Sequence, residues 1–351
     1  MVNSPLVSVI MPVYNYEKYV EEAIESILDQ TFRDFEFIII NDGSTDGTAT
    51  ILARYQQMDS RIQVYRQEHQ GIAAARNKGY SFAKGKYVAE MDADDVSFPS
   101  RLATEVEYLE KHPEIGVVGT LAKWIDRNGA YLNYYYPMFT PTLPGAIRWC
   151  FMFENCLVHV SVMIRYEILA QLGFCRELQS TEDYDLLVRA SSITKIATLP
   201  YVLMYCRLHD MNSTKFYFQQ MRQNTVKIMQ SQINQLLGSY VCEEKVYLLV
   251  HIGDTLSLEK LEQTFNLIIQ LYRTYLKRYP LGRKEAREVA QDASRRLYPI
   301  VRVASNISLH KSLFFFIQAV RINPQLLSMR IVIKAVRKLL KGSLIFFQRL
   351  V

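Results

Sequence analysis

The sequence lacks the features that mark several classes of protein. Its five cysteines stand at irregular spacings without a CxxC pair, which argues against a disulfide framework and favours free thiols in a reducing compartment. No stretch reaches the roughly 18 uninterrupted apolar residues of a membrane-spanning helix. The first residues have no basic segment followed by a long apolar run, so we expect no signal peptide. The sequence also contains no internal repeat and no low-complexity tract.

Acidic residues are missing from the end of the chain. Of the 41 Lys and Arg, eleven lie from Ala293 onward, where no Asp or Glu occurs, which leaves 30 basic and 35 acidic side chains before that point. The net charge of +6 is therefore the sum of a negatively charged part before Ala293 and a positively charged part from Ala293 onward. A length of 351 residues, 49% of them apolar and 22% charged, predicts an ordered protein of two domains, or of one large domain with an appendage.

What the sequence does contain is an alternation of strand-like and helix-like segments over its first 120 residues. Five apolar runs predict strands, and segments with apolar residues at helical spacing separate them. This order predicts an α/β fold, Rossmann-like, whose mostly parallel central sheet carries helices on both faces. A Tyr- and Pro-rich loop or flap follows at 131–145, and beyond Thr214 the pattern is mostly helical. The five runs are 6–13, 35–40, 62–66, 86–91 and 115–120.

Polar clusters follow three of the predicted strands. They are PVYN at 12–15, NDGSTDGT at 41–48 and DADD at 92–95. Because ligands of open parallel α/β sheets bind at the carboxyl ends of the strands, we expect these clusters to converge on one edge. The second cluster fits a turn followed by a helix cap equally well, so both interpretations of it stand.

The DADD cluster indicates a cation site. Three carboxylates directly after a buried strand, and before a helix that Pro99 opens, repel one another. A divalent cation relieves this repulsion, and hard cations that bind diphosphates take oxygen ligands. We therefore favour a metal and phosphate site over the alternative, a solvated acidic loop.

The ordered string of motifs resembles the family 2 glycosyltransferases. The motifs run from Val7 to Thr48, then through GIAAARNKGY and YVAEMDADD, to TEDYDLLVR. The resemblance covers residues 6–215 and implies the A-type glycosyltransferase fold. In that fold a Rossmann-like nucleotide half, about 1–120, joins an acceptor half, about 121–215. Residues 216–351 are expected to form a helical C-terminal region with a basic amphipathic tail.

The resemblance assigns several residues to a nucleotide-sugar donor. Pro12 and Tyr14 match positions that contact the nucleobase, on which Tyr14 is able to stack. Asp42 matches the residue that binds the base edge, usually of uracil, which favours a UDP-sugar. Arg76 falls near the donor phosphates, and Asp92 near the ribose and the metal.

The same resemblance places Mg²⁺ or Mn²⁺ on a DxD pair. Asp92 and Asp94 fill its two positions, and Asp94 ligates the cation that bridges the diphosphate. Asp95 is interpreted as a helix cap. His209 matches a histidine that many members place over the diphosphate, so it is a candidate contact of the metal or pyrophosphate, with a purely structural role as the alternative.

The Glu182-Asp183 pair is the candidate catalytic site. It opens a helix that Ser180 or Thr181 can cap, where acids also suit the helix dipole without any catalytic role. In the resembled family the Asp of this pair is the general base that an acceptor hydroxyl needs, so Asp183 is assigned as the base and Glu182 as a supporting residue. His159 resembles a residue on the acceptor side, and a hydrogen-bonded core histidine is an equal alternative.

The predicted reaction is metal-dependent transfer of one sugar from a nucleotide-diphosphate donor to a hydroxyl. Inversion follows because a single displacement puts the base and the leaving diphosphate on opposite faces of the sugar. The acceptor is expected to be a lipid-linked or cell-surface glycan. The alternative is a catalytically inactive nucleotide-binding-like scaffold whose basic tail binds lipid or nucleic acid. Nucleic acid is not expected, because the tail has no aromatic side chains interleaved with its charges and no known nucleic-acid module.

The C-terminal tail is predicted to be an interfacial helix. As a helix, residues 326–347 place a basic stripe beside an apolar one, and 314–316 add three Phe upstream. The apolar stripe packs on the catalytic domain in one interpretation and binds an anionic membrane in the other, which we favour because no acid interrupts the charges. We therefore expect a cytoplasmic protein, peripheral on the inner face of the cell membrane. The basic stripe comprises Arg330, Lys334, Arg337, Lys338 and Lys341.

Overall fold

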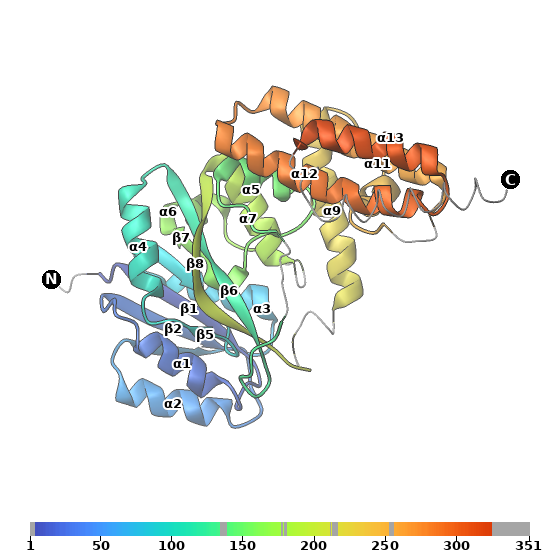
Figure 1. Ribbon diagram of the computed structural model, residues 1–351. Helices are drawn as coiled ribbons and strands as arrows, with labels where there is room; N and C mark the ends of the chain where they lie inside the picture. The colour runs from blue at the N-terminus through green and yellow to red at the C-terminus, as the bar shows by residue number, and fades with distance from the viewer. Residues whose placement is uncertain are drawn as a thin grey trace, which may run out of the picture. The chain divides into compact units, whose positions relative to one another are not determined.

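The computed structural model describes residues 4–133, 139–176, 178, 181–210, 212, 217–252 and 256–324. The chain divides into two compact units, Met1–Ile228 and Met229–Val351, and Figure 1 shows the first as a sheet with helices and the second as helices. The elements of the first unit are β1 (Val7–Val13), α1 (Val20–Leu28), β2 (Phe35–Asn41), α2 (Thr48–Met58), β3 (Ile62–Arg66), α3 (Ile72–Phe82), β4 (Tyr87–Glu90), β5 (Val96–Ser97), α4 (Arg101–Lys111), β6 (Ile115–Asp126), α5 (Pro144–Cys150), η1 (His159–Ser161), β7 (Met163–Arg165), α6 (Tyr166–Leu172), α7 (Glu182–Ile193) and β8 (Lys195–Leu208).

The central sheet has eight strands in the order β3-β2-β1-β4-β7-β6-β8-β5. β1 pairs in parallel with β2 and β4, and β2 pairs in parallel with β3, as the alternation of strands and helices predicts. β7 is antiparallel to β4 and β6, and β5 is antiparallel to β8. The predicted α/β architecture with a mostly parallel sheet is confirmed. The three-residue strand β7, too short to stand out in the sequence, lies between β4 and β6.

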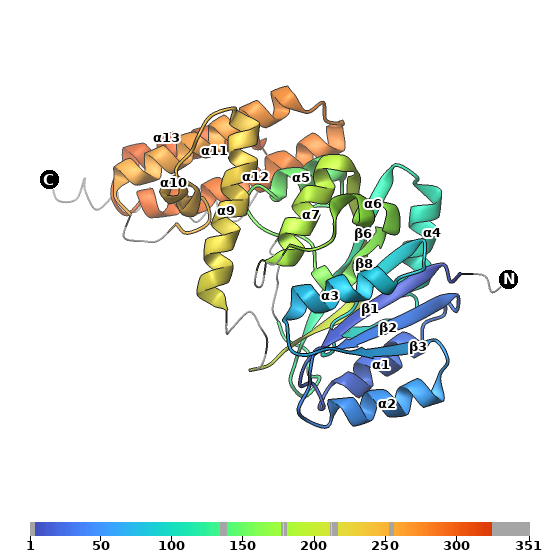
Figure 2. The same cartoon turned by 180° about the vertical axis from the view of Figure 1, so that it is seen from behind.

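Helices cover both faces of this sheet (Figures 1 and 2), because its central strands are apolar on both sides. Val7, Val9 and Met11 of β1 belong to a core cluster that includes residues of α1, α2 and α4. Ile10 of the same strand belongs to a second cluster with residues of α3, α6 and α7. The alternation along β1 thus fixes which helices lie on which face.

Pro12 occupies a central strand without breaking its ladder. Met91 donates its backbone N–H to the carbonyl oxygen of Ile10, and Asp42 donates to that of Val13. Pro12 therefore faces the β4 side, beyond the end of β4, where its missing N–H removes no ladder bond. The strand continues to the edge of the sheet where the polar loops begin.

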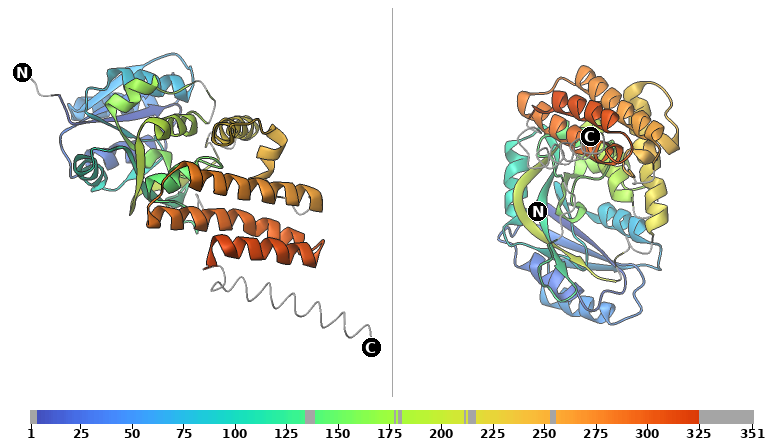
Figure 3. Two further views of the ribbon diagram at one scale, coloured as in Figure 1. Left: turned by 90° about the horizontal axis from the view of Figure 1, so that it is seen from above. Right: turned by 45° about the vertical axis from the view of Figure 1, so that its right-hand side comes forward.

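The second unit is built from helices, as the sequence beyond Thr214 predicts. α12 packs against α11 and α13, and the three lie side by side in Figure 3. Among the residues that the structure describes, no helix has the length and apolarity to cross a membrane. The predicted boundary at 215/216 stays a prediction. The helices are α9 (Phe218–Leu237), which spans the division between the units, α10 (Glu243–Leu248), α11 (Leu258–Arg278), α12 (Arg283–Ala304) and α13 (Leu309–Ile322).

A fully buried ion pair lies on α4 of the first unit. Arg101 and Glu105 stand one helical turn apart, and Arg101 Nε donates to Glu105 Oε1 at 3.2 Å. Burial raises the pKa of Glu105 to about 7, although Arg101 acts in the opposite direction. The folded protein therefore keeps a proton on Glu105 at pH values where the unfolded chain has lost it.

We expect Glu105 to make the first unit less stable as the pH rises from 5 to 8. Because the folded pKa lies above the ordinary value of 4.5, its contribution to stability is complete below about pH 4.5 and is lost as the pH rises through about 7. Over this range the wild type should lose on the order of 2 to 3 kcal/mol more unfolding free energy than Glu105→Gln, several degrees in Tm. Thermal melts across this pH range measure the difference.

The matched control is Glu107→Gln on the same helix. Glu107 is exposed, and Lys111 lowers its pKa, so it stays ionised between pH 5 and 8 and the profile of this variant should run parallel to that of the wild type over this range. Parallel pH profiles for the wild type and Glu105→Gln would contradict the assignment.

Candidate functional site

The first two polar loops are held together by Asn15. Asn15 adopts a left-handed conformation (φ 60°), in which its backbone N–H donates to Ser44 Oγ at 3.0 Å. Its side-chain Oδ1 accepts from the backbone N–H of Thr45 at 2.8 Å. Asn tolerates this backbone conformation better than most residues. The loops that follow β1 and β2 therefore form one structure at the carboxyl edge of the sheet.

The third loop, DADD, meets the same edge. Burial raises the pKa of the Tyr16 hydroxyl far above its usual range, and the nearby carboxylates of Asp94 and Asp92 raise it further. Tyr16 belongs to the first loop, since its backbone N–H donates to Thr48 Oγ1 at 3.0 Å. The predicted convergence of the three clusters on one edge is confirmed.

The DADD carboxylates form a compact acidic cluster. Asp92, Asp94 and Asp95 each offer an oxygen atom, and these atoms lie within 4.8 Å of one another. Burial raises the pKa of Asp94, as does the charge of Asp92, while a hydrogen bond with His209 lowers it. Crowded oxygen donors with uncompensated negative charge are what Mg²⁺ or Mn²⁺ prefers, so the residues present fit a divalent cation.

Two residues from the end of β8 and beyond hold Asp94. His209 Nε2 lies 2.9 Å from Asp94 Oδ2, and Asn212 Nδ2 donates to the same oxygen at 3.1 Å. Tyr19 stacks on the His209 ring, with centroids 4.8 Å apart. His209 thus reaches the cluster that the sequence assigns to it, and direct contact with a metal or pyrophosphate stays a prediction.

Asp95 does not cap a helix, which corrects the sequence-based interpretation. The short strand β5 follows it and pairs with β8, and the helix begins only at Arg101, with Ser100 at the cap position. This pairing brings Asp95 Oδ1 to the backbone N–H of Arg207, which donates at 2.8 Å. Asp95 therefore links the acidic cluster to the end of β8.

On the nucleobase side, Tyr14 and Asp42 both contact the loop that follows β3. The Tyr14 ring stacks on His69, with centroids 3.9 Å apart and planes 25° apart. The Asp42 carboxylate accepts the backbone N–H groups of Gln70 and Gly71, each at 2.9 Å, and Gln67 Nε2 at 2.7 Å. His69 Nδ1 also lies 2.9 Å from Asp42 Oδ2. Asp42 therefore shapes this loop, and its contact with a base edge stays a prediction, as do those of Pro12 and Tyr14.

Arg76 is buried between carboxylates. Its side chain is 2% exposed, and its guanidinium donates to Glu182 Oε1 at 2.5 Å and to Asp92 Oδ1 at 2.9 Å. Its Nε lies 3.6 Å from Glu90 Oε2. Burial alone lowers the pKa of Arg76, but the three carboxylates raise it well above its usual value. These contacts give Arg76 a positioning role between the carboxylates, and its predicted place near the donor phosphates stays a prediction.

The Glu182-Asp183 pair begins α7, where its two members differ in environment. Glu182 is buried, and burial together with Asp183 raises its pKa while Arg76 opposes that rise. Asp183 is half-buried, and Asn155 Nδ2 donates to its Oδ2 at 3.0 Å. Asp183 is therefore the more accessible carboxylate, with one oxygen oriented by Asn155.

Thr181 stands at the N-cap of α7 but does not act as the predicted side-chain cap. Its Oγ1 is buried and has no hydrogen-bond partner among the described residues. Ser180, the alternative cap, lies outside the described residues. The acids in the first turn remain favourably placed for the helix dipole.

His159 lies near the carboxylates of Glu90 and Asp183. Its Nε2 is 3.4 Å from Glu90 Oε2, an ion-pair distance. Burial and Arg76 lower its pKa, but Glu90 and Asp183 outweigh them, so that the pKa is raised. His159 therefore joins the Arg76 carboxylate network, which sequence reasoning left open.

The two tryptophans pack in the core. Trp149 is fully buried, and Trp124 packs partly buried against the first core cluster. All five cysteines are free thiols, as the sequence predicts. The basic stripe predicted at 326–347 lies outside the described residues.

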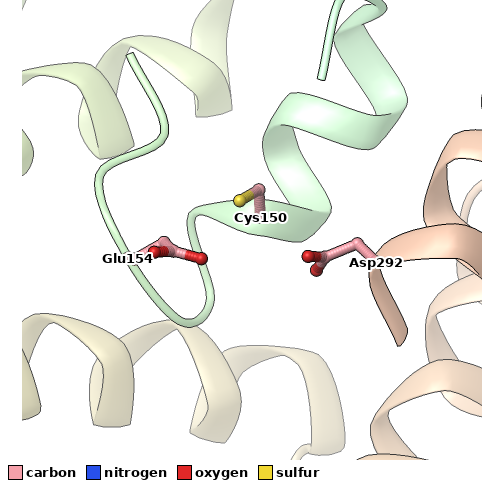
Figure 4. A group of neighbouring side chains, drawn as sticks. All are labelled: Cys150, Glu154 and Asp292. Atoms are coloured by element: carbon pink, nitrogen blue, oxygen red, sulfur yellow. The ribbon is translucent and has the colours of Figure 1, made fainter. Parts of the chain in front are cut away.

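Figure 4 draws a further group, Cys150 and Glu154 of the first unit with Asp292 of the second. Within its own unit Asp292 is already compensated, because Arg296 Nε donates to its Oδ2 at 2.6 Å and Arg295 donates to its Oδ1. We assign no site to this group.

Sequence reasoning missed three residues that shape the site, namely His69, Asn155 and Asn212. Each stands in a stretch already singled out, close to Gly71, His159 and His209 respectively. Their proximity in the sequence was a usable signal, but their partners lie far away along the chain. Asn155, for example, donates to Asp183, which lies 28 positions later in the sequence.

Comparison with known sequences identifies the family. The profile described as Glycosyl transferase family 2 matches residues 8–172. An uncharacterized glycosyltransferase of Haemophilus influenzae is 30% identical over 79% of this chain and 87% of its own length. The O-antigen biosynthesis glycosyltransferase WbnJ of Escherichia coli is 37% identical over 52% of this chain and 71% of its own. An uncharacterized glycosyltransferase of Methanocaldococcus jannaschii is 39% identical over 53% of this chain, which spans 65% of that relative.

Solved structures share the fold at low sequence identity. TarS 1-349 of S. aureus in complex with UDP-GlcNAc is 20% identical, with a TM-score of 0.54 over 92% of this chain and 91% of that one. The mannosyltransferase PcManGT of Pyrobaculum calidifontis in complex with GDP-Man and Mn²⁺ is 18% identical, with a TM-score of 0.53 over 92% and 88%. These matches confirm the expected A-type glycosyltransferase fold, and together with the sequence relatives they show that the chain belongs to glycosyltransferase family 2.

Proposed function

We propose that this glycosyltransferase moves one sugar from a UDP-sugar to a hydroxyl of a lipid-linked or cell-surface glycan, with inversion and with the help of a divalent cation. One observation carries the proposal. The half-buried carboxylate of Asp183, oriented by Asn155, stands beside Glu182, which Arg76 ties to Asp92 of the acidic cluster. A candidate base and a candidate cation site are thereby held by one network.

On the donor side, Asp92 and Asp94 are the residues proposed to hold Mg²⁺ or Mn²⁺. The related fold of PcManGT was determined with GDP-Man and Mn²⁺, which supports this choice. Bound there, the cation would neutralise charge on the departing diphosphate oxygens. His209 and Asn212 fix the orientation of Asp94 toward the cluster, and His209 is the proposed further contact of the metal or pyrophosphate.

On the acceptor side, Asp183 is the proposed general base. A hydroxyl is a poor nucleophile until its proton is taken as it attacks, and Asp183 Oδ1 is the oxygen proposed to take it. Asn155 donates to Oδ2 and so leaves Oδ1 for the acceptor. One displacement, with the base on the acceptor face and the diphosphate leaving on the other, produces inversion without a covalent intermediate.

The proposed donor and acceptor rest on residues of the first two loops and on the relatives. Asp42 and Tyr14 suit the edge and face of a uracil, and TarS, which shares the fold, was crystallised with UDP-GlcNAc. The name of the Escherichia coli relative refers to O-antigen biosynthesis, which supports a surface glycan as the acceptor. A screen of UDP-, dTDP- and GDP-sugars against lipid-linked acceptors, read by product mass, tests the proposal. Turnover of none of the three donor classes in the presence of Mn²⁺ would contradict it.

The first prediction concerns the cation. Asp94→Asn keeps the hydrogen-bonding shape of the side chain but removes charge from the cluster. We expect turnover to fall about a hundredfold or more, because a bound cation supplies several kcal/mol of transition-state stabilisation. The Mn²⁺-dependent rise in Tm with UDP should shrink as well, while the Tm of the free protein stays near that of the wild type.

The matched control for Asp94→Asn is Asp29→Asn, an exposed residue at the end of α1. It should retain wild-type turnover and the Mn²⁺-dependent shift. Wild-type turnover by Asp94→Asn in chelator-treated buffer would rule out the cation assignment.

The second prediction concerns the base. Asp183→Asn should lower kcat by about 10² to 10⁴, the range of general-base contributions. Donor affinity should change little, because this side chain acts on the proton of the acceptor. Steady-state kinetics combined with calorimetry of UDP binding separate the two effects. Loss of UDP affinity with unchanged kcat would instead assign Asp183 to the donor site.

The third prediction concerns Arg76 as the link between the two sides. A lysine is a point charge that cannot hold two carboxylates in a fixed geometry as a guanidinium does. In a double-mutant cycle on kcat/KM, Asp92→Asn and Glu182→Gln should therefore be coupled by about 1 to 3 kcal/mol, and in the Arg76→Lys background the coupling should approach zero.

Thermal melts of every member of this cycle establish that each variant is folded. Additive effects of Asp92→Asn and Glu182→Gln in the wild-type background would contradict the proposed link, because a merely structural Arg76 would not couple them.

A further inference from the structure

Within the second unit, contacts with α11 and α12 fix which face of helix α13 points inward. Phe315 stacks on Phe265 of α11, with ring centroids 4.4 Å apart. Ser312 Oγ donates to the carbonyl oxygen of Val301 on α12 at 2.9 Å, and Ala319 is buried on the same side. One face of α13 is therefore committed to packing on α11 and α12, and the opposite face is turned away from them.

That opposite face is apolar where it is most exposed. Scattered apolar residues on a surface are ordinary, but here four large ones fall within three helical turns and keep between 44% and 48% of their surface accessible. Ile307, just before the helix, is also half exposed. These four residues are Leu309, Leu313, Phe314 and Ile317. Together with His310 and Arg321, they are called the α13 outer face.

The charges around the α13 outer face have one sign. Arg321 is exposed on it as a cation, and no acid occurs in the sequence from Ala293 onward. The acid that faces the helix is Glu262 of α11, and it is compensated by Lys311, whose Nζ donates to both of its oxygens at 2.9 and 3.0 Å. An ordinary solvated helix face mixes signs, and this one does not.

We propose that the α13 outer face lies on an anionic lipid surface. Large apolar side chains beside a cation, on a helix of 14 residues that is too short to span a bilayer, are the features of a helix that lies in the membrane interface. Charge complementarity decides between the possible occupants. A second copy of the same face would offer Arg321 no acid as a partner, whereas anionic headgroups attract it.

This surface acts independently of the transfer reaction proposed above. It involves residues of the second unit alone, so its test needs no sugar donor. Its consequence is that the enzyme collects where a lipid-linked acceptor is found. The basic stripe at 326–347, which follows in the sequence, adds charge of the same sign.

The experiment is co-sedimentation of the full chain with vesicles. Vesicles of phosphatidylcholine alone are compared with vesicles containing 30% phosphatidylglycerol, on the order of the anionic content of a charged leaflet, at low and high salt. The wild type should partition to the anionic vesicles at least about tenfold better than to the neutral ones, and high salt should reduce this preference.

Two variants locate the binding on the α13 outer face. The double variant Leu313→Gln/Ile317→Gln should bind anionic vesicles about tenfold more weakly, and Arg321→Glu should reduce the preference for anionic over neutral vesicles about fivefold or more. The matched control is Met58→Gln, which removes an even more exposed apolar side chain from α2 of the first unit and should bind as the wild type does. Thermal melts verify that all variants are folded, and transfer to a water-soluble acceptor should be unchanged.

Three results would overturn the proposal. One is unaltered binding of anionic vesicles by the double variant, which would assign membrane contact to another part of the chain. Another is equal partition of the wild type to neutral and anionic vesicles. The third is a wild-type dimer in sedimentation velocity without lipid that the double variant abolishes, which would make a second copy the occupant of this face.

Discussion

The buried guanidinium of Arg76 is the interaction on which the site depends. Glu90, Asp92 and Glu182 all surround it, and without a cation between them two buried carboxylates and the partly exposed Asp92 would lie near one another. Removing one partner from such a group leaves an uncompensated buried charge, which is strongly destabilising. Because Asp92 belongs to the loop after β4 and Glu182 to the start of α7, the same contact that compensates charge also fixes the distance between the two halves of the site.

The acidic cluster illustrates how like charges are tolerated at the end of a buried strand. Each carboxylate of DADD has a separate partner: Arg76 for Asp92, His209 with Asn212 for Asp94, and the backbone of Arg207 for Asp95. These partners orient the oxygens but leave the pKa of Asp94 raised, because burial and its neighbour Asp92 outweigh them. The cluster is therefore organised without being neutralised, which is the state that suits a divalent cation.

The two units of the chain use charge in opposite ways. In the first unit, buried ions are matched one to another, as in the pairs around Arg76. In the second, Lys311 with Glu262 and Arg296 with Asp292 are paired on the inner sides of the helices, while Arg321 on the outer face of α13 is exposed. A surplus of one sign on a surface attracts a partner of the other sign and does not itself stabilise a fold.

The sequence by itself determined the α/β architecture, the convergence of three polar loops and the family. These follow from local periodicity and from motifs read in order, both of which are properties of neighbouring residues. The roles of Asp95 and Arg76 could not be obtained in this way. Asp95 looked like a helix cap until β5 paired with β8 and brought it to Arg207, 112 residues away. For Arg76, nothing in the sequence indicated that Glu182, 106 residues away, is its partner. Burial and long-range charge pairing decide which groups remain free to meet a ligand, and only the tertiary structure specifies them.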